Sequence, residues 1–251
     1  MATASSQTAL KPRKTPLVER WFFAGMAVAM IATSLVAFVP SIIHPAKRQA
    51  PLSALAATHG VVYFAWLVLF LVQSRLIATR HVGWHRKLGF SSVVILALMI
   101  PLAYTTTMAM VSRGYDLSGD LRIDHDPPYG AVFPLCNLLI FSALAIAALA
   151  YRRRPEIHKR LMLFANIELM PAPLAHLIGH TPRLASLPPA IVMVPISMFV
   201  ISAVTGDWLV ARRIHPLTWG LAIWRMVSGP LEAGPIGSSA AWHSLVNWLA
   251  R

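Results

Sequence analysis

Six apolar runs, each long enough to cross a lipid bilayer, constrain this chain more than any other feature. About 20 helical residues span a hydrocarbon core of about 30 Å, and in lipid the backbone must satisfy its own hydrogen bonds. Runs of this length lie at 21–43, 53–77, 88–112, 131–151, 159–179 and 187–211. Because 57% of the 251 residues are hydrophobic and only 12% are charged, the sequence predicts an all-α, polytopic membrane helical bundle.

Two further segments extend this prediction toward the C-terminus. A shorter apolar run at 216–231 predicts a seventh transmembrane helix, and residues 238–251 are typical of an amphipathic helix at the membrane interface. We therefore expect a basic N-terminal segment at 1–20, a transmembrane domain at 21–231 and an interfacial segment at 232–251.

Lysine and arginine residues gather on one side of the predicted membrane. Fifteen of the 22 lie before the first run or in and directly beside the second, fourth and sixth connections. The longest connection, GYDLSGDLRIDHDPPYG at 114–130, lies on the other side and carries four aspartates. Because cytoplasmic loops are enriched in basic residues, we expect a multi-pass protein of the inner membrane with a cytoplasmic N-terminus. The net charge of +13 is then a topology signal and does not indicate nucleic-acid binding.

Several kinds of chemistry are excluded by what the sequence lacks. Cys136 is the single cysteine, so disulfides, CxxC redox motifs, cysteine-held iron-sulfur clusters and CxxCH haem attachment are impossible within the chain. Motifs of serine hydrolases and nucleotide-binding proteins are absent from the contexts that they require. Whether the chain is an enzyme stays open.

Histidines form two layers, one near each predicted membrane surface. His59 and His176 lie in the outer halves of two runs, and His85 and His158 lie at cytoplasmic ends. Axial ligation of a b-type haem requires two neutral imidazoles from facing helices. We therefore predict His59 with His176 as the first candidate pair of haem ligands and His85 with His158 as the second.

Residues near the candidate ligands add to this hypothesis without making it unique. Arg86 and Arg160 follow the two cytoplasmic histidines and could bind haem propionates, and Gln73 lies on the helix face of His59. The alternative is that interfacial histidines only face lipid headgroups. The histidines could also hold a transition metal of unknown identity, with the outer-face residues Asp124, His125 and Asp126 as further ligands, although such a loop is more often a solvated turn.

Glu168 and Arg225 are predicted near the middle of the membrane. A charge there is costly, so we expect either an ion pair between them or a protonated Glu168. Pro171 and Pro173 follow Glu168 and should bend its helix. A broken helix with buried charges is also typical of transporters, although the sequence shows no inverted repeat.

Three stretches carry a resemblance to known membrane proteins. They are residues 57–89 with ATHGVVYFAW and GWHRKLG, residues 153–177 with HKRLM, and RRIHPLTWGLAIWRMVSGPL followed by AAWHSLVNWLA. The chain resembles a group of bacterial multi-pass membrane proteins over most of its length beyond the first apolar run. More distantly, it is similar to membrane proteins of cytochrome oxidase assembly and to transmembrane cytochromes b. These resemblances imply a haem-binding or respiratory redox role in a bacterial inner membrane.

The leading hypothesis is therefore a membrane protein that binds haem b or supports respiratory redox chemistry, with the lipid bilayer as its surroundings. The second is a cofactor-free assembly or accessory subunit, whose partners would be other membrane proteins. The third is a transporter that uses Glu168 and Arg225.

Overall fold

The computed structural model describes residues 17–47, 50–114, 126–185 and 189–251, and every regular element in these ranges is helical. Six segments of 21 to 32 residues are long and apolar enough to cross a membrane. They are Arg20–Ile43, Ala54–Ala78, Val82–Arg113, Pro127–Ala150, Pro155–Gly179 and Ala190–Val210. The prediction of an all-helical, multi-pass membrane protein is confirmed.

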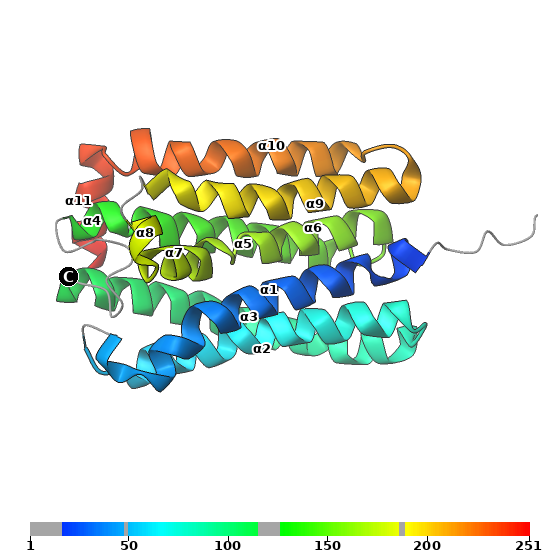
Figure 1. The fold of residues 1–251 in the computed structure, drawn as a ribbon, viewed down its shortest axis with the longest axis horizontal. Helices are drawn as coiled ribbons and strands as arrows, with labels where there is room; N and C mark the ends of the chain where they lie inside the picture. The colour runs from blue at the N-terminus through cyan, green and yellow to red at the C-terminus, as the bar shows by residue number, and fades with distance from the viewer. Residues whose placement is uncertain (1–16, 48–49, 115–125, 186–188) are drawn as a thin grey trace, which may run out of the picture.

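The long helices lie side by side and alternate in direction (Figure 1). They are α1 (Leu17–Ile43), α2 (Ala54–Ala78), α3 (Val82–Arg113), α5 (Val132–Ala150), α6 (Pro155–Ile167), α9 (Met193–Ala211) and α10 (Pro216–Leu231). The short elements are η1 (Pro45–Lys47), α4 (Pro127–Gly130), α7 (Pro171–Gly179), α8 (Pro182–Ala185), η2 (Pro189–Val192), η3 (Glu232–Ile236) and α11 (Ala240–Leu249). One end of the bundle holds the start of α1 and the connections α2–α3, α5–α6 and α9–α10. The clustered lysines and arginines lie at this end, which we call the basic end.

Helices also occupy the two predicted C-terminal segments. α10 covers the predicted residues 216–231 and packs along α9. With 16 residues it is shorter than the roughly 20 that a full crossing needs. α11 lies across the end of the bundle opposite the basic end (Figure 1).

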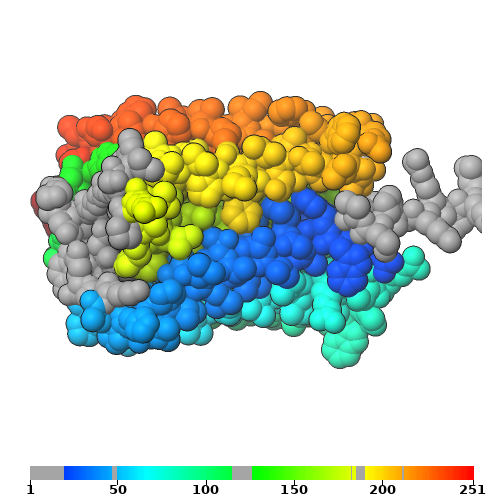
Figure 2. Space-filling model, viewed as in Figure 1, coloured from blue at the N-terminus to red at the C-terminus, as the bar shows by residue number. Residues whose placement is uncertain are grey.

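The segment Pro155–Gly179 forms the centre of the bundle. In its most apolar stretch of 18 residues, 61% of the residues are buried, against 17% to 33% in the corresponding stretches of the other five membrane-length segments. α1 and α9 meet along the face shown in Figure 2. Large side chains on the outer helices point outward, with Phe90, Val61 and Leu139 at least 70% exposed. Such exposure of apolar side chains is expected where helices face lipid.

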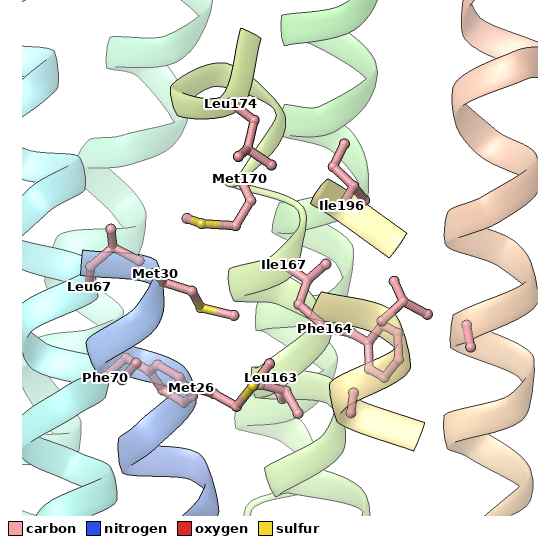
Figure 3. Packing of buried hydrophobic residues seen from close by; sticks show 14 residues of the cluster. Met26, Met30, Leu67, Phe70, Leu163, Phe164, Ile167, Met170, Leu174 and Ile196 are labelled. Carbon is pink, nitrogen blue, oxygen red and sulfur yellow. The ribbon is translucent and has the colours of Figure 1, made fainter. Parts of the chain in front are cut away.

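The core forms where the central segment meets helices from both sides (Figure 3). Phe164 and Ile167 of α6 are almost fully buried, and Met30 of α1 and Ile196 of α9 lie in the same cluster. Figure 3 shows methionine side chains of α1 reaching toward α6. Flexible methionines fill irregular gaps between helices well, so this cluster can follow the bend in the central segment.

The central segment breaks between α6 and α7, as Pro171 and Pro173 predict. A proline lacks the backbone N–H and its ring clashes with the carbonyl four residues earlier. Short-range bonds from Leu169 to Asn166 and from Met170 to Ile167 replace the regular pattern. The break brings Glu168 to the end of α6.

We expect Gly206→Leu in α9 to lower the melting temperature of the detergent-solubilised protein. A Cβ at Gly206 would lie 2.5 Å from the Phe22 ring of α1, and overpacking of this kind costs about 1 to 3 kcal/mol. Gly220→Leu in α10 is the matched control, because a Cβ there meets nothing within 4 Å. Equal losses in the two variants would contradict close packing of α1 against α9.

Candidate functional site

The basic end brings His85 and His158 together. His85 lies in the first turn of α3, which begins at Val82, six residues before the predicted run. His158 lies in the first turn of α6, after Pro155 has started that helix. The two ring centroids are 6.4 Å apart and the ring planes are inclined by 77°.

Both rings of this pair have their Nδ1 atoms occupied by the protein. Nδ1 of His158 lies 2.7 Å from the carbonyl oxygen of Ala148 in α5, so it carries the proton and donates it. In the orientation that satisfies both ends of its amide, Gln73 of α2 donates to Nδ1 of His85 at 2.6 Å and accepts from the backbone N–H of Gly89 at 3.0 Å. His85 therefore presents an Nε2–H donor and His158 presents a free Nε2 acceptor.

Arg86 and Arg160, the two arginines predicted beside this pair, lie in different surroundings. Arg86 is exposed at the basic end next to His85. Arg160 turns the other way and forms a two-point ion pair with Asp207 of α9, at 2.7 Å and 3.0 Å. Arg160 is therefore a structural cation, and only Arg86 stays available to an anionic group at the pair.

Asp207 organises the rest of this end and was not singled out from the sequence. Its carboxylate also accepts from the hydroxyl of Thr218 and from the backbone N–H of His215. His215 in turn caps α10, because its Nδ1 accepts from the backbone N–H of Leu217 at 3.1 Å. This network joins α6, α9 and α10.

His59 and His176, the first candidate pair, have separate neighbours. His59 stacks on Tyr63 at 4.2 Å between ring centroids and faces the backbone of Leu102 in α3. His176 lies 4.7 Å from the Phe38 ring of α1 and 4.2 Å from the His180 ring. No ring contact joins these two histidines among the described residues, so the structure does not bring this pair together as it does the inner one.

Glu168 and Arg225 meet at the end of α6. Nε of Arg225 lies 3.5 Å from Oε2 of Glu168, and each residue is 2% exposed. Nη1 of Arg225 also donates to Ser228 at 2.7 Å. The sequence prediction of an ion pair agrees with this geometry. Glu232, which follows α10, lies within electrostatic reach of both residues and was missed.

The proposed outer-face metal ligands are only partly within the described structure. Asp124 and His125 lie outside the described residues. Asp126 caps α4 by accepting from the backbone N–H of Tyr129, and it lies 3.7 Å from Nε2 of His243. Across residues 17–47, 50–114, 126–185 and 189–251, no group of three or more histidine, cysteine or acidic residues has the arrangement of a metal site.

Comparison with protein-family models, curated proteins and solved structures finds no match.

We expect Asp207→Asn to destabilise the protein by about 3 kcal/mol, because it removes the buried partner of Arg160 and leaves that guanidinium only an exposed carboxylate. The side chains of Arg160 and Asp207 are 7% and 12% exposed. Glu156→Gln is the control: Glu156 also pairs with Arg160 but is 62% exposed, so its loss should cost less than about 1 kcal/mol. Unfolding in detergent would measure both. A larger loss in Glu156→Gln would contradict the central role of Asp207.

Proposed function

We propose that this membrane protein holds a b-type haem between His85 and His158 at the cytoplasmic end of the bundle. The observation that carries the proposal is the 6.4 Å separation of the two ring centroids. Two imidazole nitrogens that bind one metal at about 2 Å each place their ring centres roughly 6 Å apart. Such a haem would supply one-electron redox chemistry.

The membrane orientation forms part of this proposal. The basic end would face the cytoplasm of a bacterial cell by the positive-inside rule, which makes the N-terminus cytoplasmic. α10 continues into the π-helical turn η3 without a break, and together they run from Pro216 to Ile236. This length supports α10 with η3 as a seventh span, with α11 at the outer interface.

The residues around the inner pair fit a haem. His158 already donates Nδ1–H to a backbone carbonyl, which is the usual support for a ligating histidine. His85 would ligate through Nε2 once the Gln73 amide turns to accept the Nδ1 proton. Arg86 supplies an exposed cation at the same end. Deeper in the bundle, between α2, α3 and α5, lies a packed apolar cluster that includes Trp66, Met99 and Phe141, which would keep water from the inner side of a haem at the pair.

An absorption spectrum of protein purified from haem-replete cells tests the proposal. We expect a Soret band that shifts on reduction and that is lost in His85→Ala and in His158→Ala. His81→Ala is the matched control, because His81 is an exposed histidine four residues from His85 and should keep the band. His59→Ala should keep it as well. A colourless wild type, or a band that survives in His85→Ala, would overturn the proposal.

We expect Gln73→Glu to lower the midpoint reduction potential of the bound haem. A carboxylate accepts the Nδ1 proton of His85 more strongly than an amide, and this raises the basicity of the ligating nitrogen. A redox titration of the Soret band would measure the shift. An unchanged potential would count against His85 as a ligand, because Gln73 contacts its ring directly.

The other two hypotheses predict different results. A cofactor-free assembly or accessory subunit would be colourless, and binding to other membrane subunits would then be its measurable property. Transport through Glu168 and Arg225 has less support, because the two residues are paired and almost fully buried.

A further inference from the structure

A second buried site surrounds Arg225, and the proposed haem does not use it. Glu168 at the end of α6 and Glu232 at the start of η3 both lie within electrostatic reach of this one guanidinium. Arg225, Glu168 and Glu232 are only 2%, 2% and 3% exposed. The cluster lies far from the basic end along α6, since Glu168 follows Pro155 by thirteen residues.

The charges of this cluster do not balance if both carboxyls are ionised. Two carboxylates and one guanidinium sum to one negative charge, and an unpaired charge within the membrane costs about 2.5 to 3.5 kcal/mol even on insertion scales. Within the described part of the chain, the charged or titratable groups that act on these carboxyls are Arg225, the two carboxyls themselves and the Cys136 thiol of α5. The thiol adds no positive charge, so the excess must be neutralised by something that binds.

Unfilled hydrogen-bonding positions mark the same place. Oε2 of Glu168 and Oε1 of Glu232 are buried and have no hydrogen-bond partner, and Nε of Arg225, in ionic contact with that Oε2 at 3.5 Å, makes no hydrogen bond either. Ser228 receives a bond from Arg225 at 2.7 Å and also lies against the Glu232 carboxyl. Buried polar atoms without partners are rare and need an explanation. A proton on one carboxyl would convert one acceptor into a donor and remove the excess charge.

The backbone at both carboxyls departs from regular α-helix. Glu168 lies at the proline-dependent break between α6 and α7, and Glu232 begins the π-helical turn. Turns of this kind inside or at the end of helices are frequent at functional sites. Glu168 thus lies beside Arg225 at the point where the regular helix ends, and Glu232 lies where α10 passes into the π-helical turn.

We propose that Glu168 and Glu232 form a proton-binding site in which one proton is held between the two carboxyls beside Arg225. The ligand is a proton and not a metal cation, because a fixed guanidinium already lies 3.5 Å from Glu168 and would repel a second full positive charge. At neutral pH the site holds two carboxyl groups, one proton and one guanidinium, and carries no net charge.

Infrared spectroscopy of the purified protein at neutral pH tests the site. We expect a C=O stretching band of a protonated carboxyl that shifts in D2O. Glu168→Gln and Glu232→Gln should each remove this band, because one carboxylate then remains for one guanidinium. Glu156→Gln is the control, since that carboxyl is 62% exposed, and should leave the band unchanged.

Three outcomes would overturn the proposal: no such band in the wild type, a band that persists in Glu168→Gln, or a band that persists in Glu232→Gln. If either variant does not fold, wild-type protein with ¹³C-labelled glutamate decides, because a band of this site must shift with the label. The haem proposal is independent, since its Soret band should be unaffected by Glu232→Gln in folded protein.

Discussion

The rest of the structure depends on the need to satisfy polar groups inside a bundle that lipid surrounds. Lipid offers no hydrogen bonds, so the polar side chains of the central segment must find partners on other helices. Arg160 near its start pairs with Asp207 of α9, and Glu168 near its break pairs with Arg225 of α10. These two contacts attach α9 and α10 to the centre at two different depths.

The position of His158 follows from the same constraint. Successive residues of an α-helix are rotated by about 100°, so His158 and Arg160, two residues apart, point in nearly opposite directions. Arg160 is held toward α9 and α10 by Asp207. His158 is thereby turned toward α5, where Ala148 accepts its proton, and toward His85 of α3. The ion pair on one side of α6 thus orients the histidine on the other.

Much of this arrangement could be predicted from the sequence, because hydropathy and helical rise give the depth of each residue. From depth alone, Glu168 is expected near Arg225 and His85 near His158, and the structure places the members of each pair close together. It does not give the rotation of each helix about its axis, so His59 and His176 share a membrane half but face different neighbours. Asp207 and Glu232 were missed because each lies near a helix end, where the sequence predicts exposure.

The Gln73 amide decides which chemistry the inner histidines can perform. With its nitrogen toward Nδ1 of His85, as the Gly89 contact favours, His85 offers a proton and His158 offers a lone pair. With the amide reversed, both histidines offer lone pairs, which is the state a metal requires. The reversal is one side-chain rotation, and it gives up the amide bonds to the carbonyl oxygen of His85 and to the backbone N–H of Gly89. The orientation of one amide therefore decides whether the pair offers one metal ligand or two.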